Sequence, residues 1–212
     1  MTVLEQILFF GELKNIPKDE IIKRLDYWLD KLDIKEYKYK KIKELSKGNQ
    51  QKIQFISAVI NEPKLLILDE PFTGLDPFNV STLMKYLKEM ASNGTIIIFA
   101  SHRMEHVESF CDRLIILVEG KDILQGSLKE IKDNYLKKKI HIIGDIDINR
   151  IKKITGVENI TNIDNELIID VANKDVADDI FKLVKKSKNI SKFTIEDPTL
   201  NEIFVKKVGE LK

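Results

Sequence analysis

Two acidic residues stand directly after a short apolar run, in LLILDEP at residues 65–71. We expect the run to be a β-strand, which would place Asp69 at its carboxyl end, where α/β sheets bind ligands. A carboxylate there can hold Mg²⁺ directly or through water. Glu70, one residue further on, points in a different direction and can orient or deprotonate an attacking water. Taken alone, the pair also fits an ordinary acidic junction between a strand and a turn.

Three more residues could contribute to binding an anion. Ser46 and Gly48 precede an expected helix, whose first backbone amides have no partner within the helix and can bind a phosphate. An ordinary helix cap is the competing interpretation. His102 follows the apolar run TIIIFAS at the same expected sheet edge as the acidic pair, where a neutral imidazole could bond a terminal phosphate. A surface histidine is the default there, and we assign His106 and His141 to that class.

The elements that must position these residues alternate between helices and strands. Apolar residues at helical spacing and capping signals predict helices over residues 2–13, 17–32, 48–62, 77–93, 103–110 and 127–137. Short apolar runs predict strands over residues 65–69, 95–101 and 114–118. We expect the first of these to be buried on both faces, as in a parallel sheet, and the second to be buried as well. The alternation predicts an α/β fold, and the turn EGK predicts a hairpin with residues 122–126.

The pattern changes after about Leu136, where we place a domain boundary. Runs that alternate or are rich in β-formers follow, with a helix before the last of them: KIHIIGD, ENITNI, ELIIDV and ISKFTIED. Asp197 as N-cap and Pro198 at the first helical position then predict a last helix. These elements predict a small α+β appendix over residues 137–212.

Composition narrows the function class. Lys+Arg 35 against Asp+Glu 34 in 212 residues argues against a nucleic-acid partner held by bulk charge. Cys111 excludes an internal disulfide and is expected to be a small buried hydrophobe. No apolar run approaches the roughly 20 residues of a membrane span, and the apolar start lacks the basic region of a signal peptide. We expect a cytoplasmic protein, peripheral at the membrane through a partner.

Taken together, LSKGN, LLILDE, TGLD and ASHRMEHVE, in this order and spacing, resemble the ATP-binding cassette of ABC transporters. The resemblance makes Leu45–Asn49 the signature motif, with Ser46 and Gly48 acting on the ATP of an opposite subunit. It makes Asp69 the magnesium-binding end of the Walker B strand and Glu70 the catalytic glutamate. It makes residues 73–76 the D-loop, so that Asp76 joins the nucleotide-binding set, and His102 the switch histidine. Lys47 and Asn49 depart from the family's LSGGQ.

The resemblance also implies a domain plan. Residues 1–136 correspond to part of the nucleotide-binding domain, with a helical subdomain over about 1–62 and the Walker B, D-loop and switch-histidine core over about 63–136. The tail, ending in DPTLNEIFVKKV, resembles the appendix of the bacterial sodium- or drug-exporter type of cassette. Such a protein uses ATP and Mg²⁺ and works with a transmembrane permease and a second nucleotide-binding subunit.

Two family elements are absent from these 212 residues: the phosphate loop G-x-x-x-x-G-K-[ST] and the glutamine loop. The chain resembles a cassette that starts at an internal methionine, with an incomplete P-loop NTPase core. The phosphate loop supplies backbone amides and a lysine for the β and γ phosphates, so we expect the chain alone to be inactive. We also expect residues 95–101 and 113–118 to lack the central strand that lies between them in the family, leaving a marginal chain that self-associates.

Two hypotheses about function remain open. In the first, the chain is the ATPase subunit of an ABC transporter. In the second, it is a non-catalytic interaction module that complements a complete cassette or a permease. A cassette in DNA repair or translation is disfavoured, because the chain has neither a long coiled coil nor a second cassette. The transported substrate and the direction of transport do not follow from the sequence.

Overall fold

A computed structural model describes residues 1–135, 137–185, 187 and 189–209, in two compact units, Met1–Arg103 and Met104–Lys212. The first unit contains helices α1 (Val3–Glu12), α2 (Lys18–Lys31), α3 (Lys47–Val59) and α4 (Pro77–Ser92), short 3₁₀ turns η1 (Lys35–Tyr37) and η2 (Ile42–Glu44), and strands β1 (Leu65–Asp69) and β2 (Ile96–Ala100). The second contains strands β3 (Arg113–Val118), β4 (Lys121–Ser127), β5 (Lys138–Gly144), β6 (Val157–Ile163), β7 (Glu166–Val171) and β8 (Ile190–Glu196), and helices α5 (Met104–Phe110), α6 (Leu128–Asn134), α7 (Ile148–Ile151), α8 (Lys174–Val184) and α9 (Leu200–Gly209).

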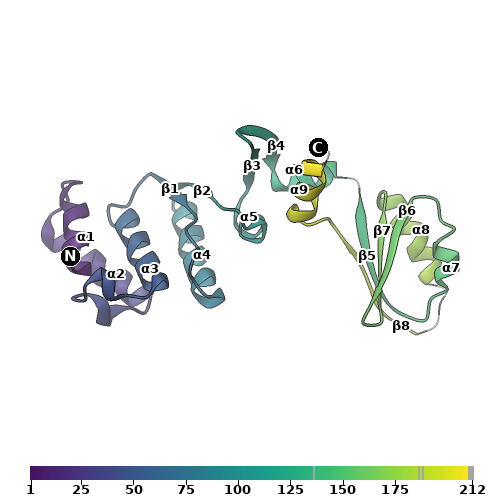
Figure 1. Cartoon of the computed structure of the whole chain (residues 1–212), viewed down its shortest axis with the longest axis horizontal. Coiled ribbons are helices and arrows are strands. Elements are labelled where there is room, and N and C mark those ends of the chain that lie inside the picture. Colours follow the sequence, from purple (N-terminus) through teal and green to yellow (C-terminus); the bar gives the residue numbers. More distant parts are fainter. Residues whose placement is uncertain (136, 186, 188, 210–212) are drawn as a thin grey trace. The chain divides into compact units, whose positions relative to one another are not determined.

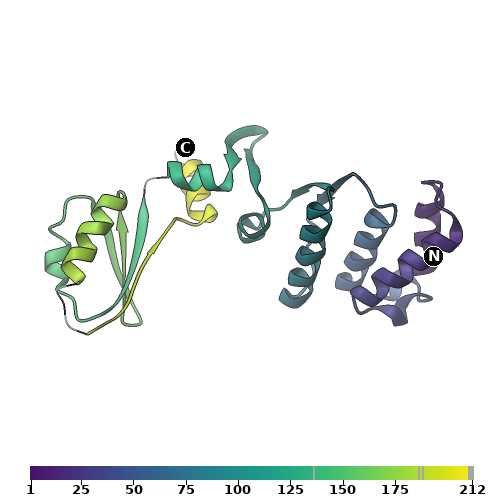
Figure 2. The same cartoon turned by 180° about the vertical axis from the view of Figure 1, so that it is seen from behind.

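Helices α1, α2 and α3 pack together at the start of the first unit. The predicted capping box of α1 is present, since Thr2 accepts the amide of Glu5 and its own amide donates to the Glu5 carboxylate. Helices α1 and α2 approach closely, because a Cβ at Gly11 would lie 2.5 Å from a carbon of Ile21. In both views α3 and α4 lie side by side (Figures 1 and 2).

Strands β1 and β2 pair in parallel, with Leu65 opposite Ile96 and Asp69 opposite Ala100. The predictions that β1 is buried on both faces and that β2 is buried are both wrong, since no residue of β2 is fully buried. Leu66 is 3% exposed, but Leu65 and Ile67 on the other face are 49% and 69% exposed. Helix α4 packs against β2, and the described elements of this unit leave the opposite face of the pair open. The physical reason is that a strand is buried only on the faces that another element covers.

In the second unit, helix α5 is followed by the predicted hairpin of β3 and β4. Its turn has positive φ at Glu119 (51°) and Gly120 (78°), as a tight hairpin turn requires. Strand β3 pairs with β4 in an antiparallel, two-stranded sheet. A small core joins the hairpin to α6 and α9 through Leu114, Ile116, Ile131, Leu200 and Ile203.

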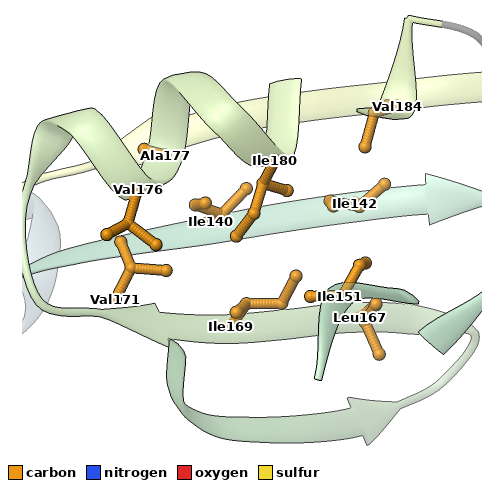
Figure 3. Packing of buried hydrophobic residues seen from close by; sticks show 10 residues of the cluster. All are labelled: Ile140, Ile142, Ile151, Leu167, Ile169, Val171, Val176, Ala177, Ile180 and Val184. Atoms are coloured by element: carbon orange, nitrogen blue, oxygen red, sulfur yellow. The ribbon is translucent and has the colours of Figure 1, made fainter. Parts of the chain in front are cut away.

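Strands β5 to β8 form the predicted α+β appendix, in the order β6-β7-β5-β8 with antiparallel neighbours. The chain order strand, helix, strand, strand, helix, strand is the split βαβ arrangement of ferredoxin-like folds. Helices α7 and α8 cover one face of this sheet. Figure 3 shows their apolar side chains meeting those of β5 and β7: Ile140, Ile142, Ile151, Leu167, Ile169, Val171, Val176, Ala177, Ile180 and Val184.

Several local predictions need correction. Helix α9 begins at Leu200, with a reciprocal pair of hydrogen bonds between Thr199 and Glu202 at its start, so Asp197 is not its cap. His106 is buried (8% exposed), so its assignment as a surface histidine is wrong: α5 is amphipathic and turns this side chain inward. Leu136, where we placed the domain boundary, lies outside the described residues.

His141 is not a plain surface histidine either. Its side chain is 15% exposed and lies between the carboxylates of Glu166, 3.2 Å from Nδ1, and Glu196, 3.5 Å from Nε2. Its place in the central strand β5, flanked by β7 and β8, explains the partial burial. Cys111 is half-buried, and burial raises the pKa of its thiol to about 11, which keeps it protonated and unreactive at neutral pH.

Candidate active site

The chain turns directly after β1, and the first residue of this turn, Glu70, has an unusual backbone conformation. Glu70 has φ of +46°, a left-handed conformation that costs a non-glycine residue about 1–2 kcal/mol. Its amide donates to the carbonyl of Ala100 at 3.0 Å, so the turn is joined to the end of β2. Backbone strain of this kind persists only where the surroundings hold it, and it is concentrated at functional sites.

The carboxylate of Glu70 is held by the two residues that follow β2. Oε1 accepts the backbone amide of His102 at 2.7 Å and lies 2.7 Å from Nδ1 of its ring. Oε2 accepts the hydroxyl of Ser101 at 3.3 Å. Burial opposes ionisation of Glu70, but the hydrogen bonds from His102 and Ser101 outweigh it and lower the pKa of the carboxyl. Glu70 is therefore a carboxylate at neutral pH, fixed in direction by its neighbours.

The structure brings Glu70 and His102 together as predicted from their places at neighbouring strand ends. Ser101 was missed, although its position between β2 and His102 could have indicated it. The His102 side chain is 75% exposed and that of Glu70 33% exposed, so the pair faces solvent on one side. A group in this position can accept a proton from a water molecule that sits in front of it.

Asp69 lies at the last position of β1, with an exposed side chain. Among the described residues no group of three or more His, Cys, Asp or Glu side chains could enclose a metal ion. Mg²⁺, however, commonly takes only one or two protein carboxylates and completes its shell with phosphate oxygens and water. Asp69 therefore fits the role of a single protein ligand to a magnesium ion that arrives with a nucleotide.

Ser46 is the N-cap of α3, and its hydroxyl accepts the amide of Asn49 at 3.3 Å. Asp76 caps α4 in the same way, since it accepts the amide of Asn79 at 2.9 Å and this bond lowers its pKa. Gly48 packs against the turn before α4, because a Cβ at this position would lie 2.9 Å from the carbonyl oxygen of Gly74. The start of α3 and the TGLD turn are thus in direct contact within one chain.

Comparisons with known proteins show which family the chain resembles. The family described as "ABC transporter" matches residues 1–73, and the family described as "ATP-binding protein DrrA1-3-like, C-terminal domain" matches residues 126–208. An uncharacterized ABC transporter ATP-binding protein of Bacillus subtilis, YhaQ, is 44% identical over 99% of this chain and 70% of its own length.

Two examples illustrate the likeness to solved structures. The ATP-binding subunit of an ABC transporter is 28% identical with a TM-score of 0.60, covering 64% of this chain and 56% of its own. The protein cbiO1 of Clostridium perfringens, described as part of the ABC transporter complex cbiONQ, is 34% identical with a TM-score of 0.52, covering 72% of this chain and 56% of its own. The chain thus spans 56% of the length of either solved cassette.

On this identity and coverage the chain belongs to the ATP-binding proteins of ABC transporters. Its α/β core with a helical part and an α+β appendix matches that class. In the part of the chain that the structure describes, no helix has both the length and the apolar character needed to cross a bilayer.

Proposed function

We propose that Asp69, Glu70 and His102 form the hydrolytic half of a nucleotide site in an ABC transporter ATPase. Asp69 binds the magnesium ion of ATP–Mg²⁺, which neutralises charge on the transferring phosphoryl group. Glu70 orients the attacking water and accepts its proton. His102 holds Glu70 and offers its exposed ring to the terminal phosphate. The observation that carries this proposal is the 2.7 Å contact between Glu70 Oε1 and His102 Nδ1.

Glu70 suits the role of base for two reasons. Its lowered pKa keeps it ionised, and its fixed direction means that little reorganisation is needed when a water molecule binds. In any form of this protein that also carries a phosphate loop, Glu70→Gln should nearly abolish ATP hydrolysis while leaving ATP binding intact. Unchanged turnover in that variant would remove Glu70 from the role of base.

We assign Ser46 and Gly48 to the ATP of a second nucleotide-binding subunit. The α3 start offers amides and the positive end of a helix dipole, which favour a phosphate. Asp76, by capping α4, fixes the turn that contacts Gly48. In a mixed dimer, Ser46→Arg on one subunit should block hydrolysis at the other subunit's site and leave its own site's ATP affinity unchanged. Loss confined to the substituted subunit's own site would contradict the assignment.

These 212 residues contain no phosphate loop, so we propose that they do not by themselves bind ATP–Mg²⁺ with ordinary cassette affinity. Calorimetric titration of ATP–Mg²⁺ into the purified chain should show no binding in the micromolar range, and micromolar affinity would refute this. The second candidate, an interaction module that presents its signature face to a complete cassette or a permease, is favoured by the intact cap at Ser46. Stimulated hydrolysis by a complete cassette on addition of the Glu70→Gln chain would support that candidate.

The partner expected for either role is a membrane permease. The similar protein cbiO1 is described as part of a transporter complex, and this chain's helical unit presents exposed aromatic residues, Phe9 and Phe10, on α1. Docking on a permease would place the protein at the membrane.

A further inference from the structure

The turn at Glu70 is supported from α3 as well as from β2. Gln51, one turn into α3, has a half-buried side chain. Its amide Nε2 donates to the backbone carbonyl of Glu70 at 3.4 Å and to that of Pro71 at 3.1 Å. One side chain of the signature helix thus holds two consecutive carbonyls of the turn that carries the proposed base.

The Glu70 carbonyl depends on such donors because it has left the β ladder. If the parallel ladder of β1 and β2 continued, the amide of His102 would donate to the backbone carbonyl of Glu70. In the structure that amide donates to the Glu70 carboxylate instead. The displaced carbonyl accepts from the amide of Thr73 at 3.2 Å and from Gln51. The left-handed conformation of Glu70 and the aim of its carboxylate are therefore linked to Gln51.

A second contact fixes the same two segments. Gly48 and Gln51 are three residues apart and lie on one face of α3. Gly48 meets the carbonyl of Gly74, where there is no room for a Cβ, while Gln51 bonds the turn at Glu70. The helix start and the turn from Glu70 to Gly74 thus touch at two places.

We propose that Gln51 is a positioning residue that joins the signature helix to the turn of Glu70, so that the two move as one body. This proposal rests on the proposed function, in which the start of α3 contacts the nucleotide bound by the partner subunit and Glu70 acts on the nucleotide bound by its own subunit. Closure of the signature on a partner's phosphate would then be passed to Glu70 through Gln51. Gln51 does not itself touch the reacting atoms.

The test uses the 212-residue chain and needs no nucleotide. In Gln51→Met, which keeps length but removes both donors, NMR-detected hydrogen exchange of the Glu70 and Thr73 amides should become about tenfold faster, as expected when a hydrogen bond that holds a local structure is lost. The amides of Ile53 and Ile56 in α3 should exchange as before. The control is Gln54→Met, on the exposed side of the same helix.

A second measurement separates positioning from packing. The amide of His102, which donates to the Glu70 carboxylate, should also exchange faster in Gln51→Met, because the carboxylate loses its alignment with His102. Gln51→Glu has nearly the same size but cannot donate when ionised, so it should behave as Gln51→Met does. Wild-type behaviour in Gln51→Glu, or equal acceleration across α3, would overturn the proposal. Because neither measurement involves ATP, its failure is distinct from failure of the roles proposed for Glu70 and Ser46.

Discussion

Substitution of Ile67 by lysine should weaken self-association of this chain without weakening its fold. Leu65, Ile67, Ile96 and Ile98 lie on one face of the β1–β2 pair and are 49%, 69%, 64% and 54% exposed. Each strand of the pair also has one edge with no partner strand among the described residues. An open apolar face flanked by open edges favours pairing with another chain.

The magnitude follows from the exposed fractions, which add up to a little over two whole side chains. Burying one such side chain completely contributes about 1.5–3 kcal/mol, so covering the face contributes roughly 4–7 kcal/mol per copy. Association itself costs about 4–15 kcal/mol, which leaves weak self-association at micromolar to millimolar concentration. Ile67 alone contributes about 1–2 kcal/mol per copy. Because roughly 1.4 kcal/mol corresponds to a factor of ten in a dissociation constant, a lysine there should raise the midpoint concentration of self-association at least tenfold.

The assay is sedimentation velocity over a concentration series, combined with thermal unfolding of each variant. Tyr39→Lys is the control, because Tyr39 is 73% exposed and lies outside the sheet. Dissociation by Tyr39→Lys as effective as by Ile67→Lys would show that the sheet face is not the contact. A monodisperse wild-type monomer with a cooperative thermal transition above about 60 °C would refute the reasoning altogether. It would mean that the open apolar face neither drives self-association nor lowers the stability of the fold.

Two further predictions concern the site and the appendix. The pKa of Glu70 in the folded chain lies below the ordinary 4.5. The hydrogen bonds of its carboxylate therefore contribute their full share to the free energy of unfolding above pH 4.5, and this share is lost as the pH falls through the folded-state pKa. His102→Ala should raise the ¹³C-detected pKa of Glu70, and an unchanged titration would contradict the bonds. Ile169→Ala should cost about 2–5 kcal/mol in chemical denaturation, against about 0.5 kcal/mol or less for the half-exposed Ile163→Ala. Equal costs would contradict the packing in Figure 3.

Local chemistry made much of the fold predictable. The EGK turn was predicted because a tight hairpin needs residues that tolerate positive φ, and Gly120 supplies one. The Thr2–Glu5 and Ser127–Glu130 capping boxes each mark a real helix start. At the start of α9 two capping signals stand side by side, Asp197-Pro198 and Thr199-x-x-Glu202, and the helix uses the second, so the start predicted from the first is wrong.

Burial could not be predicted in the same way. An apolar run such as LLILD shows that a strand can be buried on both faces, but the cover comes from elements distant in the sequence. Leu66 is covered by another element and is buried, whereas the face that carries Ile67 stays exposed. His106 and His141 were misjudged for the same reason, because a polar residue's burial depends on what its helix or strand packs against.

The proximity of Glu70 and His102 follows from the register of β1 and β2, and the same register explains which bonds the Glu70 side chain makes. In the parallel pairing Asp69 lies opposite Ala100, so Glu70 and His102 occupy the next places of a ladder that stops there. The amide of Glu70 still bonds Ala100, but the amide of His102 bonds the Glu70 side chain in place of its main chain. The carboxylate thus completes the ladder and, through Oε1, holds the imidazole. An aspartate is one carbon shorter, so Glu70→Asp should weaken both the bond to the His102 amide and the contact with its imidazole, whereas Glu70→Gln keeps an acceptor oxygen in reach of both. Hydrogen exchange of the His102 amide should therefore be faster in Glu70→Asp than in Glu70→Gln, and equal rates would contradict this account.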